Sequence, residues 1–287
     1  MTTSSRPPVL LLGGTGRTGR RVARRLAARG QRVRVASRRG DPPFAWDAPD
    51  GWPALLDGVS AAYVAYAPDL ALPEAEGHLR RLGRAARAAG LQRLVLLSGR
   101  GEPAAARSEA ALREAGVPLA VVRSSWFAQD FSEHFLRDGV LDGVVALPTA
   151  GRPDAAEAFV DVDDVADVVV ALLLAVEAST QTLELSGPGL VTFGEAAATI
   201  AAATGRPLAH LPLDVAGFAA GAVAAGVPRE EAEPLARLFA EVLDGRNEHL
   251  TDDVARVLRR PPRAFADVVR EAAAAGAWDV VPAGAAC

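Results

Sequence analysis

The sequence predicts an α/β fold, a doubly wound parallel sheet with helices on both faces, followed by a smaller, mostly helical C-terminal lobe. In the first half, apolar runs with the length of buried strands alternate with segments of helical period. A glycine-rich turn joins the first of these runs to the first helix. The 287 residues exceed one ordinary domain of roughly 100 to 200 residues, so one domain with an appended lobe is expected.

The first half of the chain alternates regularly between strand and helix. Residues 9–12 form a continuous apolar run, residues 18–29 carry apolar side chains at helical spacing, and Val33 begins a second strand. Further strands are expected at 61–65, 94–97 and 119–122, and further helices at 74–89 and 108–115. Strands separated by such helices form a parallel sheet, whose ligands bind at the carboxyl ends of the strands.

The alternation loosens from about Trp126 onward. A helix ending near Ala175 and a strand at 183–185 are expected, and the chain from Thr192 on is mostly helical. Candidate helix N-caps are Thr192, Asp214 and Thr251. We therefore predict a sheet domain in residues 1–150, to which the strand and helix of residues 158–186 can return, and a smaller helical substrate lobe in residues 187–287.

Composition and charge exclude several classes of protein. Half of the residues are hydrophobic and 23% are charged, as in globular proteins rather than disordered chains. A net charge of -4 provides no field that would attract nucleic acid. The longest apolar run, residues 165–176, is interrupted by Asp167 and is too short to span a membrane. The N-terminal segment lacks a signal-peptidase site, so a cytoplasmic location is expected.

The potential metal ligands are few and scattered. Cys287 is the only cysteine, and the four histidines lack ligand spacing, so no metal site is expected. Asp161, Asp163 and Asp164 could hold a hard cation by their spacing. We favour an N-cap and first-turn role for them, because acids before a helix interact with its positive end.

The glycine-rich turn contains the G-x-G-x-x-G pattern at Gly14, Gly16 and Gly19. It directly follows one expected strand and opens one expected helix, as in the Rossmann fold. Glycine suits this position because the turn is tight and the pyrophosphate of a dinucleotide approaches the bare backbone at the helix N-terminus. A dinucleotide site is therefore predicted, the alternative being a glycine-rich turn without a ligand.

The end of the second strand indicates which dinucleotide binds. An acidic residue there would hold the ribose hydroxyls of NAD, but the sequence has Ser37 and Arg38 instead. Arg38 can form charge-assisted hydrogen bonds with a 2′-phosphate, so NADP is the expected cofactor, with NADPH preferred over NADH. The alternative is a pair of arginines on a solvated loop.

Several segments resemble the NmrA-like atypical short-chain dehydrogenase/reductases. They are VLLLGGTGRTGRRVARRL at 9–26, FAWD at 44–47, LVLLSG at 94–99, VPLAVVRSSWFAQDF at 117–131, FVDVDDVA at 159–166 and RRPPRAFADVV at 259–269. The resemblance is closest to the ergot-alkaloid reductase branch (agroclavine and festuclavine dehydrogenases) and looser to NADPH quinone reductases. It covers the chain from Val9 to Trp278.

The resemblance implies roles for individual residues. Ser37 and Arg38 match the 2′-phosphate site, and Asp47, at the place of a polar residue after the family's third strand, would face the adenine. Ser98 stands where short-chain dehydrogenases keep their catalytic serine, with a satisfied loop hydroxyl as the alternative. The phosphate turn is matched by Gly13, Gly14, Thr15, Gly16, Arg17, Thr18 and Gly19, and the riboses by Ala65, Tyr66 and Ala67.

The candidate substrate residues are Trp126, Phe127 and Asp130, although both aromatic side chains could simply fill a core. In the family branch an asparagine commonly occupies the position of Asp130, so here the sequence departs from the pattern.

The catalytic pattern of the short-chain dehydrogenases is incomplete. The Tyr-x-x-x-Lys pair is absent, because the only tyrosines are Tyr63 and Tyr66 and the chain contains no lysine. Reducing an ordinary ketone creates an alkoxide that needs a proton donor, whereas an iminium yields a neutral amine and a quinone yields a stabilised phenolate. The expected function is therefore NADPH-dependent reduction of an activated small molecule, a cyclic iminium or a quinone, in secondary metabolism.

Two other functions fit the same residues. A non-catalytic NAD(P)-binding redox sensor or regulator would also lack the Tyr/Lys pair, and a non-redox cyclase or dehydratase could use the same fold. The expected partner is a small-molecule substrate, with no nucleic acid and no membrane, and the oligomeric state stays open.

Overall fold

The computed structural model describes residues 6–40, 43–149 and 151–279. The chain divides into two compact units. Unit 1 comprises Met1–Ser124, Val162–Leu185 and Asp252–Pro261, and unit 2 comprises Ser125–Asp161, Ser186–Thr251 and Pro262–Cys287. The domain boundaries expected from the sequence, at residues 150 and 187, stay a prediction.

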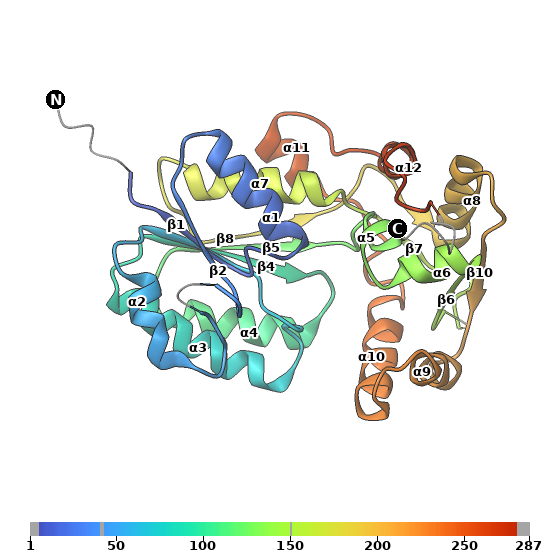
Figure 1. Ribbon diagram of the computed structural model, residues 1–287, viewed down its shortest axis with the longest axis horizontal. Helices are drawn as coiled ribbons and strands as arrows, with labels where there is room; N and C mark the ends of the chain where they lie inside the picture. Colours follow the sequence, from blue (N-terminus) through green and yellow to red (C-terminus); the bar gives the residue numbers. More distant parts are fainter. Residues whose placement is uncertain (1–5, 41–42, 150, 280–287) are drawn as a thin grey trace, which may run out of the picture. The chain divides into compact units, whose positions relative to one another are not determined.

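Unit 1 contains a parallel sheet with the strand order β2-β1-β3-β4-β5-β8 (Figure 1). All five pairings in this sheet are parallel, which confirms the predicted fold class. The strands are β1 (Val9–Leu12), β2 (Val33–Ala36), β3 (Ala61–Val64), β4 (Arg93–Gly99), β5 (Leu119–Ser124) and β8 (Gln181–Leu185).

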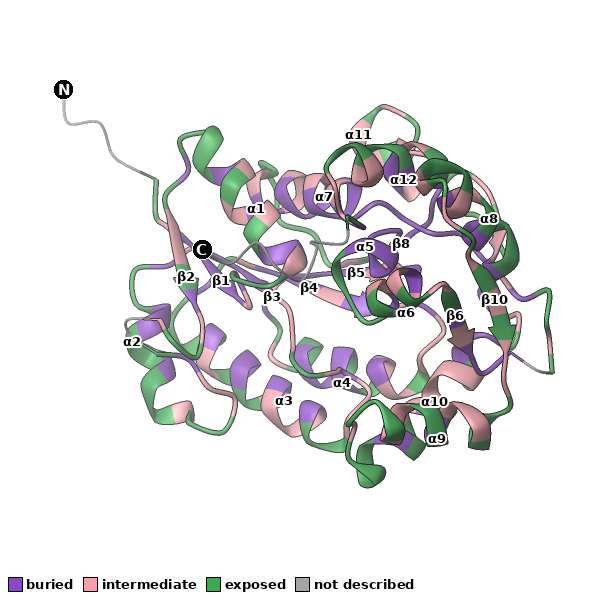
Figure 2. Ribbon diagram, turned by 45° about the vertical axis from the view of Figure 1, so that its right-hand side comes forward, coloured by how far each residue is buried: buried purple, intermediate pink, exposed green. Residues whose placement is uncertain are grey.

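Helices cover both faces of the sheet of unit 1 (Figure 1). One face carries α1 (Arg17–Ala28), α7 (Val162–Leu174) and α11 (Asp253–Leu258), and the other carries α2 (Trp52–Leu56), α3 (Pro73–Ala88) and α4 (Pro103–Arg113). Figure 2 shows buried residues along the strands and on the inner sides of these helices. All four residues of β1 and of β3 are buried, as expected for strands in the middle of a doubly wound sheet.

Residues 43–60, which include Asp47, contain no strand. The segment consists of a loop, a short 3-10 helix at Pro49–Gly51 and α2. The loop is held by local contacts instead of a ladder: the Phe44 N–H donates to the Ser37 carbonyl over 2.9 Å, and the Trp52 indole N–H donates to the Ala45 carbonyl over 3.0 Å. The expected position of Asp47 at the adenine stays a prediction.

Unit 2 is mostly helical, as predicted, and also contains two small sheets. Its helices are α5 (Asp130–Glu133), α6 (Leu136–Asp142), α8 (Phe193–Thr204), α9 (Val215–Ala224), α10 (Arg229–Val242) and α12 (Phe265–Ala274). One small sheet pairs β6 (Val144–Leu147) with β10 (Ala209–Pro212) in parallel, and the other pairs β7 (Ala156–Glu157) with β9 (Val191–Thr192) in antiparallel fashion.

Two of the three expected N-caps of this part of the chain are confirmed. The Thr192 hydroxyl accepts the Glu195 N–H and forms a capping box, and the Asp214 carboxylate accepts the Gly217 N–H. Thr251 is not the N-cap of α11, because that helix begins at Asp253 and Asp252 occupies the N-cap position.

The core of unit 2 is built largely from aromatic rings. Phe131 and Phe159 lie edge to face with centroids 5.4 Å apart, and Phe265 contacts both. The Trp278 indole N–H donates to the Phe131 carbonyl over 2.8 Å, which satisfies its polar atom within the core. Among the described residues, no helix combines the length and apolar character that crossing a bilayer requires.

Candidate functional site

Three glycines, two in the turn after β1 and one in the first turn of α1, are required by the fold itself. Gly13 has a φ of 79°, and a Cβ added there would lie 2.8 Å from the Ala65 carbonyl oxygen. A Cβ on Gly14 would lie 2.9 Å from side-chain carbons of Leu11 and Val35, and one on Gly19 would overlap the Gly13 backbone. These glycines let the turn pack against β1, β2 and the loop after β3.

Gly16 is less constrained by the fold than the other three glycines. It is the N-cap of α1 with extended backbone angles, it is exposed, and an added Cβ would have only the Gly13 carbonyl oxygen near it, at 3.2 Å. The first turn of α1, all of which the structure describes, contains no acidic side chain. The N-terminus of α1 beside Gly16 therefore suits an anionic group.

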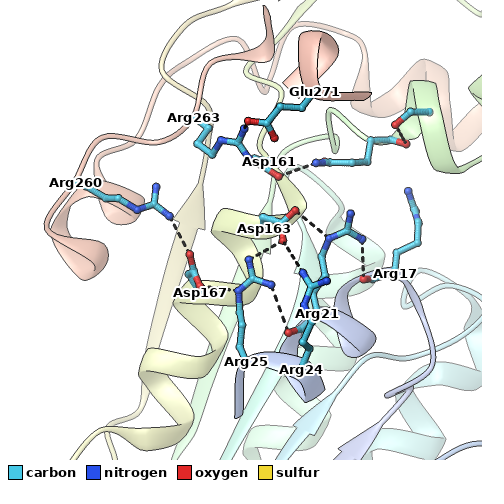
Figure 3. A network of polar contacts seen from close by, with 12 residues as sticks. Arg17, Arg21, Arg24, Arg25, Asp161, Asp163, Asp167, Arg260, Arg263 and Glu271 are labelled. Atoms are coloured by element: carbon cyan, nitrogen blue, oxygen red, sulfur yellow. Dashed lines mark hydrogen bonds and ion pairs between the residues drawn. The ribbon is translucent and has the colours of Figure 1, made fainter. Parts of the chain in front are cut away.

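Helix α1 is fixed by ion pairs with α7 (Figure 3). Arg25 donates to Asp163 over 2.6 Å and to Asp167 over 2.7 Å, and Arg21 donates to Asp163 over 3.1 Å. Burial alone would raise the pKa of Asp163, but the hydrogen bonds and charges of Arg25 and Arg21 outweigh it and hold this pKa below its usual range. Asp163 therefore lies in the first turn of α7, as expected, and also binds two arginines of α1.

Ser37 and Arg38 directly follow β2. The Ser37 carbonyl accepts N–H groups of Gly40, over 3.0 Å, and Phe44, over 2.9 Å, which fixes a turn with Arg38 exposed on it. Leu12 of β1 and Ala36 of β2 are register partners, so this turn begins beside the glycine turn at the same edge of the sheet. The structure thus brings these two sequence-predicted segments together.

The loop after β3 completes this edge of the sheet. The Ala65 N–H donates to the Leu12 carbonyl over 3.0 Å, which places Ala65 next to the glycine turn. The Tyr66 ring lies 4.6 Å from that of Trp46, and its hydroxyl lies 2.7 Å from His78 Nδ1. Burial and the nearby Glu74 charge raise the pKa of Tyr66. Ala67 and Asp47 are exposed.

Trp46 and His78 were missed by the sequence-based prediction. His78 lies on α3, and its ring stacks on both Trp46 and Tyr66. Burial and the Arg81 charge lower the pKa of His78, which favours a neutral ring that can share the Tyr66 hydroxyl proton. Trp46 directly precedes Asp47 in the FAWD segment, so the sequence could have indicated it as a site residue. Nothing in the sequence links His78 to this segment.

Ser98 belongs to a row of polar side chains at the carboxyl ends of three strands. Ser98 on β4, Arg123 on β5 and Glu184 on β8 are register partners. The Ser98 hydroxyl donates to Glu109 Oε1 over 2.6 Å, and Arg123 donates to the same carboxylate over 2.9 Å and 2.7 Å. The hydrogen bond with Glu109 raises the pKa of Arg123. Glu109, on α4, is 1% exposed and was not predicted as a site residue.

The three candidate substrate residues lie close together in unit 2. The half-buried Trp126 ring contacts Phe135, Phe193 and Phe239 at centroid distances of 5.9, 5.6 and 5.2 Å. The Phe127 N–H donates to Asp130 Oδ2 over 3.1 Å, and Asp130 itself is buried. Trp126 thus contributes to the core of unit 2 while keeping part of its surface exposed.

Comparisons with known proteins agree with this fold. No family model matches the chain. It is 31% identical to the oxidoreductase YesF of Bacillus subtilis, over 94% of this chain and 96% of that one. It is 30% identical to agroclavine dehydrogenase of Claviceps fusiformis, over 92% and 96%. The NADPH-dependent quinone oxidoreductase QOR2 of Escherichia coli, solved with NADPH, superposes with a TM-score of 0.74 at 18% identity, over 92% and 99%.

The Rossmann sheet and these full-length likenesses define the protein as an oxidoreductase. The chain belongs to the NmrA-like atypical short-chain dehydrogenase/reductases, together with the ergot-alkaloid reductases agroclavine and festuclavine dehydrogenase.

Proposed function

We propose that the protein is an NADPH-dependent reductase of an activated small-molecule electrophile, a cyclic iminium or a quinone, in secondary metabolism. One observation carries the cofactor assignment: Gly16 exposes the N-terminus of α1 at the edge of the sheet where Ser37 and Arg38 also lie. The relatives that support the substrate class are agroclavine dehydrogenase and the quinone oxidoreductase QOR2.

In this proposal each part of the edge binds one part of the cofactor. The backbone from Gly13 to Gly19 and the N-terminus of α1 hold the pyrophosphate, and Arg38 with Ser37 binds the 2′-phosphate. Tyr66, fixed by Trp46 and His78, lies beside the adenosine with Asp47, and Ala65 and Ala67 leave room for the riboses. NADPH would supply a hydride.

The proton-donating groups of unit 1 explain the choice of electrophile. Tyr63 is fully buried, which raises the pKa of its hydroxyl strongly, and the Tyr66 hydroxyl is bonded to His78. Ser98 stays the predicted catalytic residue, but a substrate oxygen would have to compete with Glu109 for its proton. An electrophile that needs little protonation is therefore favoured over an ordinary ketone.

The contribution of unit 2 to this function is to hold the substrate. Trp126 and Phe127 offer apolar, partly exposed rings, and Asp130 supplies a buried carboxylate beside them. Such an arrangement suits a flat or polycyclic molecule, orienting it and excluding water.

The test measures NADPH binding and NADPH oxidation separately. Binding is followed by the fluorescence of the bound cofactor, and oxidation by its absorbance, with menadione and with N-methyl-3,4-dihydroisoquinolinium as substrates. Binding with turnover of at least one substrate supports the proposal. Binding without turnover on a wide panel of quinones and iminiums would favour a redox sensor, and absence of binding would favour a non-redox enzyme.

A further inference from the structure

Tyr66 and His78 connect the loop after β3 to α3 through their side chains, within unit 1. The Tyr66 hydroxyl lies 2.7 Å from His78 Nδ1, and the two rings lie 5.9 Å apart at an interplanar angle of 30°. Burial and the Glu74 charge raise the pKa of Tyr66, so its hydroxyl keeps its proton. Burial and the Arg81 charge lower the pKa of His78, which favours a neutral ring. The tyrosine hydroxyl therefore donates and the imidazole nitrogen accepts.

Trp46 completes this group of rings. Its ring lies 4.6 Å from that of Tyr66, at 39°, and 6.2 Å from that of His78. Phe44, edge-on at 4.8 Å, holds the Trp46 ring from another side. The rings of Trp46, Tyr66 and His78 are all half-buried. Rings that only fill a core are buried, whereas half-buried rings offer a surface to a flat ligand.

The rings lie beside the glycine turn. Ala65, the residue before Tyr66, donates its N–H to the Leu12 carbonyl over 3.0 Å. Its carbonyl oxygen would lie 2.8 Å from a Cβ on Gly13. In the proposed function this turn holds the pyrophosphate of the cofactor, and one ribose separates the pyrophosphate from the adenine. Adenine has the flat π-face that stacks on aromatic side chains, so it is the part of the cofactor that suits these rings.

His78 restricts the Tyr66 ring from a rigid element. The hydrogen bond of Ala65 fixes the backbone of the loop, but it leaves the tyrosine side chain free to change rotamer. His78 lies on α3 between Ala75 and Leu79, which are both fully buried and anchor this part of the helix. A bond from such a helix holds the ring in one orientation before a ligand arrives, which lowers the entropy that binding costs.

We propose that His78 is a positioning residue of the cofactor site, which holds the Tyr66 ring in the orientation that stacks on the adenine of NADPH. The inference rests on the proposed function. It assigns contact with the base to Tyr66 and Trp46, and it gives His78 no contact with the cofactor. Loss of the bond between His78 and Tyr66 should therefore weaken binding of the adenosine half of the cofactor without unfolding unit 1.

The experiment measures the Kd of 2′,5′-ADP, the adenosine half of NADP, by isothermal titration calorimetry. His78→Phe keeps a ring beside Trp46 and lacks the acceptor, whereas His78→Asn loses the ring and keeps an oxygen near the place of Nδ1. We expect His78→Phe to weaken binding about tenfold and His78→Asn to stay within about threefold of wild type. Gln92→Ala, at an exposed neutral side chain after the end of α3, is the control and should bind as wild type.

A double-mutant cycle tests whether Tyr66 carries the effect. Tyr66→Phe removes the donor and should weaken binding about as much as His78→Phe, and combining the two changes should cause no further loss. Thermal denaturation checks that each variant is folded. Tyr66→Phe and His78→Asn provide the same comparison if His78→Phe does not fold. A larger loss in His78→Asn than in the variants without the bond, additive losses in the cycle, or unchanged affinity in His78→Phe would overturn the inference.

The outcomes separate this inference from the proposed function. Wild-type protein that oxidises NADPH, with a folded His78→Phe variant that keeps its affinity for 2′,5′-ADP, overturns the role of His78 and leaves the reductase standing. A tenfold loss of affinity in that variant, in a protein that oxidises NADPH with no substrate, supports the role of His78 and contradicts the reductase. Wild-type protein that does not bind 2′,5′-ADP overturns both the role of His78 and the assignment of NADP.

Discussion

The Ser98 hydroxyl donates a hydrogen bond of 2.6 Å to the carboxylate of Glu109, which is 1% exposed. The same carboxylate accepts three hydrogen bonds from Arg123, so the serine is the third partner of an ion pair whose carboxylate is buried. A serine that would be assigned to catalysis from its position alone is therefore also part of the packing between β4, β5 and α4.

Removing the Glu109 side chain should destabilise unit 1. Glu109→Ala removes the carboxylate that the Ser98 hydroxyl and Arg123 share, while Arg123 keeps its ion pair with Glu184, so we expect a loss of about 2 kcal/mol of unfolding free energy. Urea denaturation measures the loss. Glu114→Ala is the control. Glu114 caps the end of α4 and forms an exposed pair with Arg80, so its removal should change stability little. Similar effects of the two variants would contradict the structural role of Glu109.

Ser98→Ala should lower turnover modestly, toward the low end of the roughly 10²- to 10⁴-fold that a positioned donor contributes. Its proton is already engaged with Glu109, so a large catalytic share is not expected. Steady-state kinetics on whichever quinone or iminium turns over provides the measurement. Complete loss of activity in a folded Ser98→Ala variant would show that the serine is the dominant acid and that the electrophile class is wrong.

Trp126→Ala should lower kcat/KM more than Ser98→Ala if the ring contacts an aromatic substrate. Trp126→Phe should retain much of the activity, because a ring still packs against Phe135 and Phe239. Thermal denaturation of both variants separates loss of substrate contact from loss of packing in unit 2. Wild-type kinetics in a folded Trp126→Ala variant would remove this residue from the substrate site.

Gly16→Val should abolish NADPH binding while the protein stays folded. The backbone at Gly16 is extended and its added Cβ meets only the Gly13 carbonyl oxygen at 3.2 Å, so the branched side chain would project where the phosphates are proposed to lie. Gly77→Val, at an open position of α3, controls for the effect of a branched residue in or near a helix. Gly19→Val should instead unfold unit 1. Unchanged NADPH affinity in Gly16→Val would place the cofactor elsewhere.

Arg38→Ala should weaken NADPH binding by roughly 1.5 to 3 kcal/mol and NADH binding far less, because only NADPH carries the 2′-phosphate. Fluorescence titration of both cofactors measures the difference, and Arg39→Ala, the exposed neighbour, is the matched control. Equal losses for the two cofactors, or a wild-type preference for NADH, would overturn the assignment of NADP.

The Asp163 ion pairs should make stability depend on pH. The pKa of Asp163 is lower in the folded than in the unfolded chain, so its contribution is present above the unfolded pKa of about 3.9 and is lost as the pH falls through the folded pKa. The difference in unfolding free energy between wild type and Asp163→Asn should therefore be larger near pH 7 than near pH 2. Asp138→Asn, at an exposed carboxylate, is the control. A difference that did not shrink in acid would contradict this electrostatic role.

The sequence allowed the segment from Val9 to Ala28 to be predicted almost residue by residue. A continuous apolar run, glycines at fixed spacing and a helical period are all local signals, and here local and tertiary structure agree. The short parallel pair of β6 and β10 was missed. Each strand has only four residues, and the two strands lie far apart in the chain.

The site could be predicted only in part for the same reason. The turn, Ser37 and Ala65 lie next to one another because parallel strands end at one edge of the sheet, which the alternation of strands and helices already indicates. The contacts of Glu109 with Ser98, of His78 with Tyr66 and of Asp163 with Arg25 depend on how helices pack on the sheet.

The central claim is that the protein transfers a hydride from NADPH to an activated electrophile. The most direct measurement uses NADPH carrying deuterium at the transferable position of the nicotinamide, with N-methyl-3,4-dihydroisoquinolinium and menadione as substrates. The account predicts NADP formation at a rate equal to substrate reduction, and deuterium at the reduced iminium carbon of the tertiary amine product. Tight NADPH binding with no oxidation of the cofactor by either substrate, and no deuterated product, would contradict it.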